Sequence, residues 1–196
     1  MKMFTAGLIA IAVIILAIAI RPRVARTTLL KEGEIAPPFT TQMVTGDTQA
    51  PVSLADFHGK KVVLYFYPKD ETPGCTKEAC AFRDGYARYT NAGLVVLGCS
   101  IDSAEAHKDF IRKNGLPFPL LLDPDKKIAK AYGAANGIPI LGLDRRITYV
   151  IDENGKILKV YPSVDPSTHA IEILNDLGVA DAAPPAQASP APPTSN

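Results

Sequence analysis

The sequence predicts an α/β fold in which a central mixed sheet carries helices on both faces. Two uninterrupted runs of apolar, β-branched and aromatic residues, at 62–67 and 94–99, suit strands that are buried on both faces. A helix-compatible segment follows each run, and a hairpin signal lies closer to the C-terminus. Strands that alternate with helices are typical of an α/β sheet with helices packed on it.

The remaining elements follow from their start and stop signals. Gly115, Gly133 and Gly178 each end a helical pattern, and Asn154-Gly155 is a hairpin turn signal. In chain order the sequence predicts a strand over 62–67, a helix over 75–90, a strand over 94–99, a helix over 103–114, a strand over 118–122, a helix over 125–132, a hairpin of 147–151 with 157–161, and a helix over 167–177. This order fits the thioredoxin-like architecture.

Composition excludes some classes of function. The chain has 196 residues and a formal net charge of +1, from 21 basic and 20 acidic residues, so no long-range field would gather nucleic acid. Three cysteines are too few for a disulfide-dense scaffold, and an odd number leaves one unpaired. Cysteine is therefore expected to serve chemistry.

The chain is expected to hold one folded domain with an appendage at each end. Residues 1–31 read as an N-terminal membrane anchor, or a signal peptide, with a linker, because Met3 to Ile20 is an almost unbroken apolar run of about 18 residues. This predicts a bacterial cell membrane protein with a single N-terminal span on an undetermined side, or a periplasmic protein after cleavage. Residues 32–178 form the expected domain, and 179–196 a disordered Pro/Ala-rich tail.

The segment most informative about function is 67–80, which reads Tyr-Pro-Lys-Asp-Glu-Thr-Pro-Gly-Cys-Thr-Lys-Glu-Ala-Cys. It runs from the end of a central strand into a helix, which is where ligands bind in open α/β sheets. Cys75 would lie at the helix N-terminus, where unpaired backbone N–H groups and the helix dipole favour a thiolate. Thr72 can supply a hydroxyl to the same space, Pro68 stiffens the loop, and a distant Arg is the natural second donor. We expect Cys75 to attack a peroxide.

Cys80 can capture the sulfenic acid that such an attack would leave on Cys75. On one regular helix the two Cα atoms would lie roughly 8.6 Å apart, beyond the limit of about 7 Å for a disulfide. The first turns of the helix must then unwind in each cycle. Two alternatives stay open, namely a pair of buried apolar cysteines and a metal site, although the Cys-x4-Cys spacing is long for metal ligands.

At these residues the chain resembles the Q-type peroxiredoxins, also called bacterioferritin comigratory proteins. The resemblance is strongest over 62–84 and extends to Gly33-Glu34, Asp102-Ser103, Leu116-Pro117-Phe118 and the segment 146–152. It implies a thiol peroxidase that reduces hydrogen peroxide and organic hydroperoxides.

The resemblance also implies roles for individual residues. Cys75 would be the peroxidatic cysteine and Cys80 the resolving one, while Pro68, Thr72 and Arg146 would complete the peroxide site. The protein would be a monomer whose Cys75-Cys80 disulfide is reduced by thioredoxin or a similar dithiol. We expect no cofactor and no metal.

Other polar and sulfur-bearing residues allow more than one interpretation. Cys99 would be a small core residue or a back-up resolving thiol. Arg145 and Arg146 point to opposite faces of a strand, so only one can reach Cys75. His107 and His169 lie in predicted helices and are expected to be surface or packing residues.

Two functions of other kinds remain open from the residues alone. A Cys-His hydrolase could pair Cys75 with His169, but it would have no use for Cys80. A membrane-anchored thioredoxin-like dithiol oxidoreductase or binding module is the second alternative, and it predicts slow reaction of Cys75 with peroxide.

Overall fold

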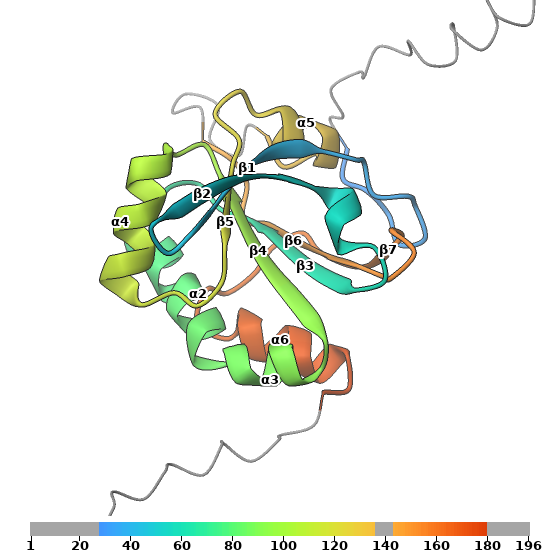
Figure 1. The fold of residues 1–196 in the computed structure, drawn as a ribbon. Helices are drawn as coiled ribbons and strands as arrows, with labels where there is room; N and C mark the ends of the chain where they lie inside the picture. The colour runs from blue at the N-terminus through green and yellow to red at the C-terminus, as the bar shows by residue number, and fades with distance from the viewer. Residues whose placement is uncertain (1–27, 136–142, 180–196) are drawn as a thin grey trace, which may run out of the picture.

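The computed structural model describes residues 28–135 and 143–179. The strands are β1 (Thr40–Thr45), β2 (Thr48–Ser53), β3 (Lys61–Phe66), β4 (Leu94–Ser100), β5 (Leu120–Leu122), β6 (Ile147–Ile151) and β7 (Ile157–Tyr161). The helices are η1 (Leu54–Phe57), α2 (Pro73–Asp84), α3 (Tyr86–Asn91), α4 (Ala104–Asn114), α5 (Lys127–Tyr132) and α6 (His169–Asp176). The described strands form one sheet in the order β2-β1-β5-β4-β3-β6-β7 (Figure 1). The predicted anchor and nearly all of the predicted tail lie outside the described residues.

The centre of the sheet is made by β3 and β4, as predicted. Every residue of β3 after Lys61 is buried, because apolar side chains stand on both sides of its pleat. It runs parallel to β4, with Phe66 opposite Cys99, and antiparallel to β6, with Phe66 opposite Ile147. The residue that precedes β6, Arg146, is therefore brought beside the end of β3.

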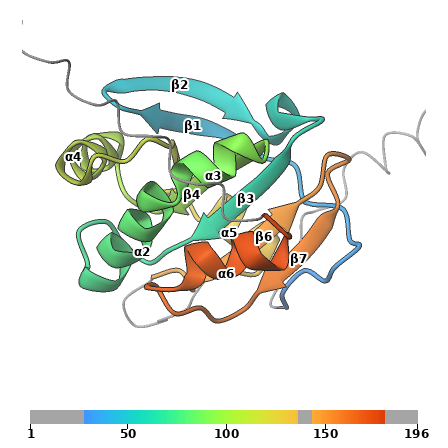
Figure 2. The same cartoon turned by 90° about the horizontal axis from the view of Figure 1, so that it is seen from below.

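Helices cover both faces of the sheet, which confirms the predicted fold class. On one face α2, α3, α4 and α6 pack on an apolar cluster that includes Phe82, Phe110 and Ile173. On the other face α5 packs on a second cluster that includes Cys99 and Tyr132. Figure 2 shows α2 and α3 following one another in front of the sheet, with α6 beside them. The sheet thus separates two apolar layers.

The single helix predicted over 75–90 is two helices in the structure. α2 begins at Pro73, which suits a first turn because its missing N–H group needs no partner there. It ends at Asp84, and the next residue, Gly85, donates its N–H to the Ala81 carbonyl at 3.1 Å before α3 begins at Tyr86. Glycine is a poor helix former, so the break falls where the helix is weakest.

A hairpin at one edge of the sheet was not predicted. β1 and β2 pair antiparallel, with Thr40 opposite Ser53 and a tight turn at Gly46, which has a φ of +57°. Only Val44 of β1 and Val52 of β2 are buried. The strands are mostly Thr, Gln and small residues, so their alternation of apolar and polar positions is too weak to identify from the pattern.

Candidate active site

Cys75 is the third residue of α2 and follows the carboxyl end of β3. It belongs to the first helical turn, whose N–H groups have no partner within the helix and favour negative charge. Thr72 is the N-cap residue, with an extended backbone at φ −79° and ψ 146°. The strand-to-helix position predicted for Cys75 is thus the one that the structure describes.

Cys75 is buried, with 2% of its surface exposed. The reason is the side chain of Arg146, whose Nη2 donates to the Cys75 Sγ at 3.2 Å. Gly74 permits this approach, because a Cβ atom at that position would lie 3.2 Å from Arg146 Nη2 and 3.9 Å from Pro166 Cγ. Arg146 therefore covers the sulfur and places a positive charge against it.

Glu78 completes a triad with Cys75 and Arg146 that the sequence motif did not reveal. Its carboxylate forms an ion pair with Arg146, and its side chain is fully buried. Burial raises the pKa of Glu78 from 4.5 to about 7, and Arg146 opposes that shift. Glu78 lies three residues after Cys75, and this spacing places both on one side of α2, so helical periodicity was the signal that could have found it.

The pKa of Arg146 responds to the same neighbours. Burial lowers it, but the charge of Glu78 and the contacts with Cys75 outweigh burial and raise the pKa above its ordinary value. The guanidinium thus remains charged while it bridges the carboxylate and the sulfur. Arg145, the neighbouring arginine, uses its backbone N–H to bond the Ala134 carbonyl at 2.7 Å.

Thr72 and Pro68 lie in the loop between β3 and α2. The Thr72 hydroxyl donates to the Lys69 carbonyl at 3.0 Å, so in this structure its proton closes the loop and is not directed at Cys75. Pro68 is half-buried in the same loop. The structure places both residues next to the start of α2, within the segment that leads to Cys75.

Cys80 lies five residues after Cys75 in the same helix. It is half-buried, and its Sγ lies 3.9 Å from Asn114 Oδ1 at the end of α4. All three cysteines are free thiols. Because α2 is a continuous helix from Pro73 to Asp84, a separation of roughly 8.6 Å between the two Cα atoms follows from helical geometry.

Cys99 lies in β4 on the other face of the sheet, in the apolar layer under α5. It is fully buried, and burial raises the pKa of its thiol. Cys99 is thus a small side chain of the core, which was one of the two interpretations of this residue. The other was a back-up resolving thiol.

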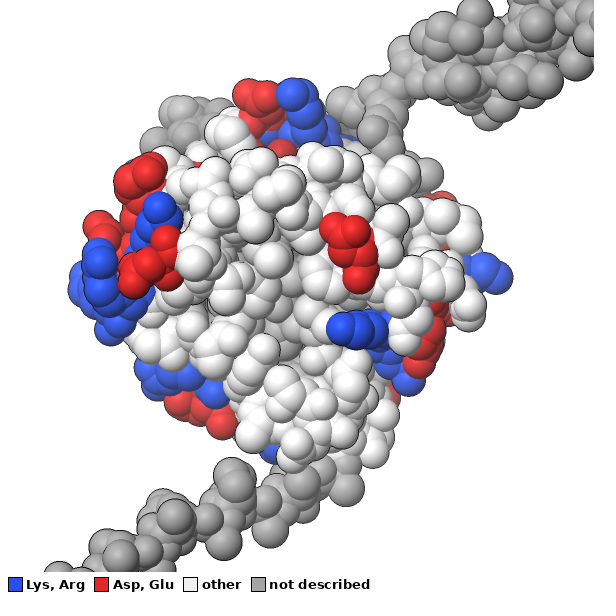
Figure 3. All heavy atoms as spheres, viewed as in Figure 1, with Lys and Arg blue, Asp and Glu red and all other residues white. Residues whose placement is uncertain are grey.

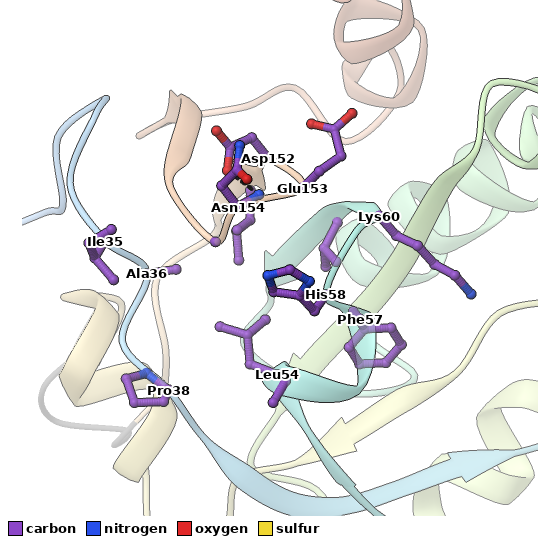
Figure 4. A pocket seen from close by; sticks show the side chains of 14 residues that line it. Ile35, Ala36, Pro38, Leu54, Phe57, His58, Lys60, Asp152, Glu153 and Asn154 are labelled. Atoms are coloured by element: carbon purple, nitrogen blue, oxygen red, sulfur yellow. Dashed lines mark hydrogen bonds between the residues drawn. The ribbon is translucent and has the colours of Figure 1, made fainter.

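Other surfaces of the molecule are separate from this triad. An apolar pocket of about 180 Å³ is lined by Leu54, Phe57 and His58, and by the β6–β7 turn (Figure 4). It lies at the start of β3, whereas Cys75 follows the end of that strand. Acidic and basic side chains are mixed around the face seen in Figure 3, most densely beside α4. Among the described residues no group of three or more His, Cys, Asp or Glu could hold a metal ion.

Comparison with known proteins identifies the family. Residues 33–160 match the AhpC/TSA family. The chain belongs to the AhpC/TSA family. It is a peroxiredoxin, a thiol peroxidase of the Q type, and it has the thioredoxin-like peroxiredoxin fold.

Relatives of this peroxiredoxin cover roughly three quarters of the chain. It is 48% identical over 144 residues to the chloroplastic peroxiredoxin Q of Sedum lineare, which covers 73% of this chain and 75% of that one. Among solved structures, a PrxQ mutant of Xylella fastidiosa is similar with a TM-score of 0.70 and 29% identity, over 77% of this chain and 97% of the other. The peroxidoxin BcpB of Mycobacterium tuberculosis is similar with a TM-score of 0.68 and 32% identity, over 76% and 97%.

The predicted localisation of this peroxiredoxin is wrong. The sequence predicted a bacterial cell membrane with a single N-terminal span, or a periplasmic location after cleavage. The relatives include a chloroplastic enzyme, which agrees with neither location. Within residues 28–135 and 143–179, no helix is both long and apolar enough to cross a bilayer. The apolar run of 3–20 lies outside these ranges, and its length is near the lower limit for a span, so the run alone was weak support.

Proposed function

We propose that this peroxiredoxin reduces hydrogen peroxide and organic hydroperoxides with Cys75 as the attacking residue. The Cys75 thiolate attacks one oxygen of the hydroperoxide, an S–O bond forms, and the O–O bond breaks. The alcohol, or water, leaves with a proton, and Cys75 becomes a sulfenic acid. The observation that carries this proposal is the Arg146 Nη2 at 3.2 Å from Cys75 Sγ at the start of a helix.

Arg146 is proposed to act on both the sulfur and the substrate. A guanidinium beside the sulfur favours the anionic thiol, and its remaining N–H groups can donate to a peroxide oxygen as charge develops there. The buried ion pair with Glu78 fixes the guanidinium in this orientation. Thr72 and Pro68 are proposed to bound the peroxide site, which requires the Thr72 hydroxyl to turn from the Lys69 carbonyl when peroxide binds.

Cys80 is proposed to resolve the sulfenic acid. Its sulfur attacks the sulfur of Cys75, an S–S bond forms, the S–O bond breaks, and water leaves. The two Cα atoms must first approach to within about 7 Å, so α2 must open between them. A dithiol of the thioredoxin kind would then return two electrons by thiol–disulfide exchange and allow α2 to reform.

Substitution of each cysteine tests the proposal. Cys75→Ser should abolish peroxide reduction, because an alcohol is a far weaker nucleophile at neutral pH. Cys80→Ser should consume one equivalent of peroxide and then stop as a sulfenic acid that dimedone labels in mass spectrometry. Cys99→Ala is the matched control and should turn over like the unmodified protein, because Cys99 lies on the other face of the sheet.

The outcome of these experiments decides the assignment. Sustained turnover by Cys75→Ser would show that another group attacks the peroxide. A peroxide-treated protein with neither a labelled Cys75 nor a Cys75-Cys80 disulfide would exclude the two-cysteine cycle. For the reductant, reduced thioredoxin should sustain turnover at a rate that equimolar glutathione does not reach, and equal rates would remove the preference for a protein dithiol.

A further inference from the structure

A buried hydrogen-bond network lies beneath the loop that precedes α2. Its centre is Asp70, which is 5% exposed and carries three contacts. The Tyr67 hydroxyl donates to Asp70 Oδ1 at 2.7 Å, and His107 Nδ1 lies 2.8 Å from Asp70 Oδ2. The Asp70 backbone N–H donates to Asp102 Oδ2 at 2.9 Å. Asp70 is thereby tied to the end of β3, to α4 and to the segment after β4.

His107 ties this network to the sheet as well. It is fully buried, and its other ring nitrogen, Nε2, lies 3.3 Å from the Leu121 carbonyl oxygen of β5. Both ring nitrogens therefore face oxygen atoms, one on the loop and one on the sheet. His107 thus connects Asp70 to a central layer of the fold.

The loop around Asp70 needs such an anchor. Glu71, the next residue, has a φ of +61°, a left-handed conformation that non-glycine residues adopt only when their surroundings enforce it. Thr72, one residue further, begins α2 without a side-chain capping bond. The Thr72 hydroxyl closes this turn on the Lys69 carbonyl, and Lys113 of α4 forms an exposed ion pair with Glu71. Asp70 is the residue of the turn whose side chain is buried and bonded to distant segments.

We propose that Asp70 and His107 are positioning residues for peroxide reduction. Together they hold the loop that carries Pro68 and Thr72 in the conformation that binds peroxide beside Cys75. Neither residue touches the reacting atoms in this arrangement, so both act through the loop. The inference rests on the proposed peroxide site at Pro68, Thr72 and Cys75.

Variants of the pair test the inference in the full-length chain carrying Cys80→Ser, which isolates the oxidation step. Asp70→Asn and His107→Leu should each lower the second-order rate constant for oxidation of Cys75 by hydrogen peroxide at least about ten-fold, because small displacements of positioning groups have large effects on rate. His107→Asn keeps a donor near the place of Nδ1 and should recover most of the loss. Alkylation of Cys75 by iodoacetamide, which needs the thiolate but no peroxide site, should not slow.

Two tyrosine variants separate an effect on the loop from a general loss of stability. Tyr67→Phe removes the hydroxyl that donates to Asp70, whereas Tyr89→Phe removes an equally buried hydroxyl that donates to the Ala170 carbonyl at 2.6 Å. Both variants lose one buried hydrogen bond and should show similar shifts in urea unfolding. Only Tyr67→Phe should slow the oxidation of Cys75, and Tyr89→Phe should stay within about two-fold of its parent.

Several results would overturn the inference. Unchanged oxidation rates in Asp70→Asn and His107→Leu would remove the pair from catalysis. An equal loss in Tyr89→Phe would show that the effect is one of general stability, and alkylation that slows in proportion to oxidation would assign the pair to the thiol instead of the peroxide site. These results are distinct from failure of the proposed function, which would show as turnover by Cys75→Ser.

Discussion

Opening of α2 is the step that the structure constrains most, and a glycine in the middle of the helix tests it. Lys77 is exposed and lies between Cys75 and Cys80. Glycine is less favourable than lysine in a helix interior by roughly 0.7 kcal/mol. If the disulfide forms only after α2 opens, Lys77→Gly should raise the population of the open helix, and so the rate of disulfide formation, about three-fold. Lys77→Ala should leave that rate equal or slightly lower, because alanine favours the helix.

The assay must separate disulfide formation from oxidation of Cys75. One equivalent of hydrogen peroxide is added to the reduced protein, samples are quenched with acid and alkylated, and mass spectrometry follows the sulfenic acid and the disulfide. Lys130→Gly is the control, because it makes the same substitution at an exposed position of α5, on the other face of the sheet. It should lower the free energy of unfolding without a change in the rate of disulfide formation.

Two results would refute the argument for opening. If Lys77→Gly forms the disulfide no faster than the unmodified protein, helix opening does not limit the step. If Lys130→Gly accelerates it as much as Lys77→Gly does, the effect arises from general loosening of the fold and not from the segment between the cysteines.

Three further predictions concern Glu78, Gly74 and Arg146, which surround Cys75. Burial raises the pKa of Glu78 to about 7, so the folded state binds its proton more tightly than the unfolded state, and this contribution to stability is fully present below pH 4.5 and is lost as pH rises through 7. Glu78→Gln carries no titrating group at this position. Between pH 5 and pH 8 its free energy of unfolding in urea should therefore rise by roughly 2–3 kcal/mol relative to that of the unmodified protein. No relative rise would show that Glu78 is not desolvated as described. Gly74→Ala places a Cβ atom 3.2 Å from Arg146 Nη2 and should lower the rate of peroxide reduction about ten-fold, and an unchanged rate in stopped flow would show that the guanidinium can shift freely. Arg146→Ala should lower the same rate about 100-fold with an unchanged circular dichroism spectrum, and an activity close to that of the unmodified protein would remove the guanidinium from the reaction.

The sequence was most informative where side-chain pattern and local geometry agree. The continuous apolar runs identified β3 and β4, because only a strand buried on both faces tolerates such a run. The position of Cys75 at a helix start followed from Pro73-Gly74 after a strand. Arg146 could be selected over Arg145 only through the family resemblance, because the choice depends on pairing between β3 and β6 that the sequence pattern does not specify.

What the sequence did not reveal depends on contacts between distant segments. His107 was expected to be a surface or packing residue, and the sequence could not show that it is fully buried against Asp70, 37 positions earlier. Glu78 was not singled out from the sequence, because its partner in the fold is Arg146, which immediately precedes β6. The contact that covers Cys75 also joins distant segments, since Arg146 lies 71 positions away.

The division of the core into two layers has a consequence for the oxidised enzyme. Cys75, Ala79 and Phe82 of α2 all belong to one layer, whereas Cys99 and its neighbours fill the other. If α2 opens as proposed, the first layer loses the part of its cover that α2 provides, while α3, α4 and α6 remain on it and the second layer stays closed. The disulfide form should consequently expose more apolar surface to solvent and self-associate more readily than the dithiol form. Prompt re-reduction would then protect the solubility of the protein as well as restore its thiol.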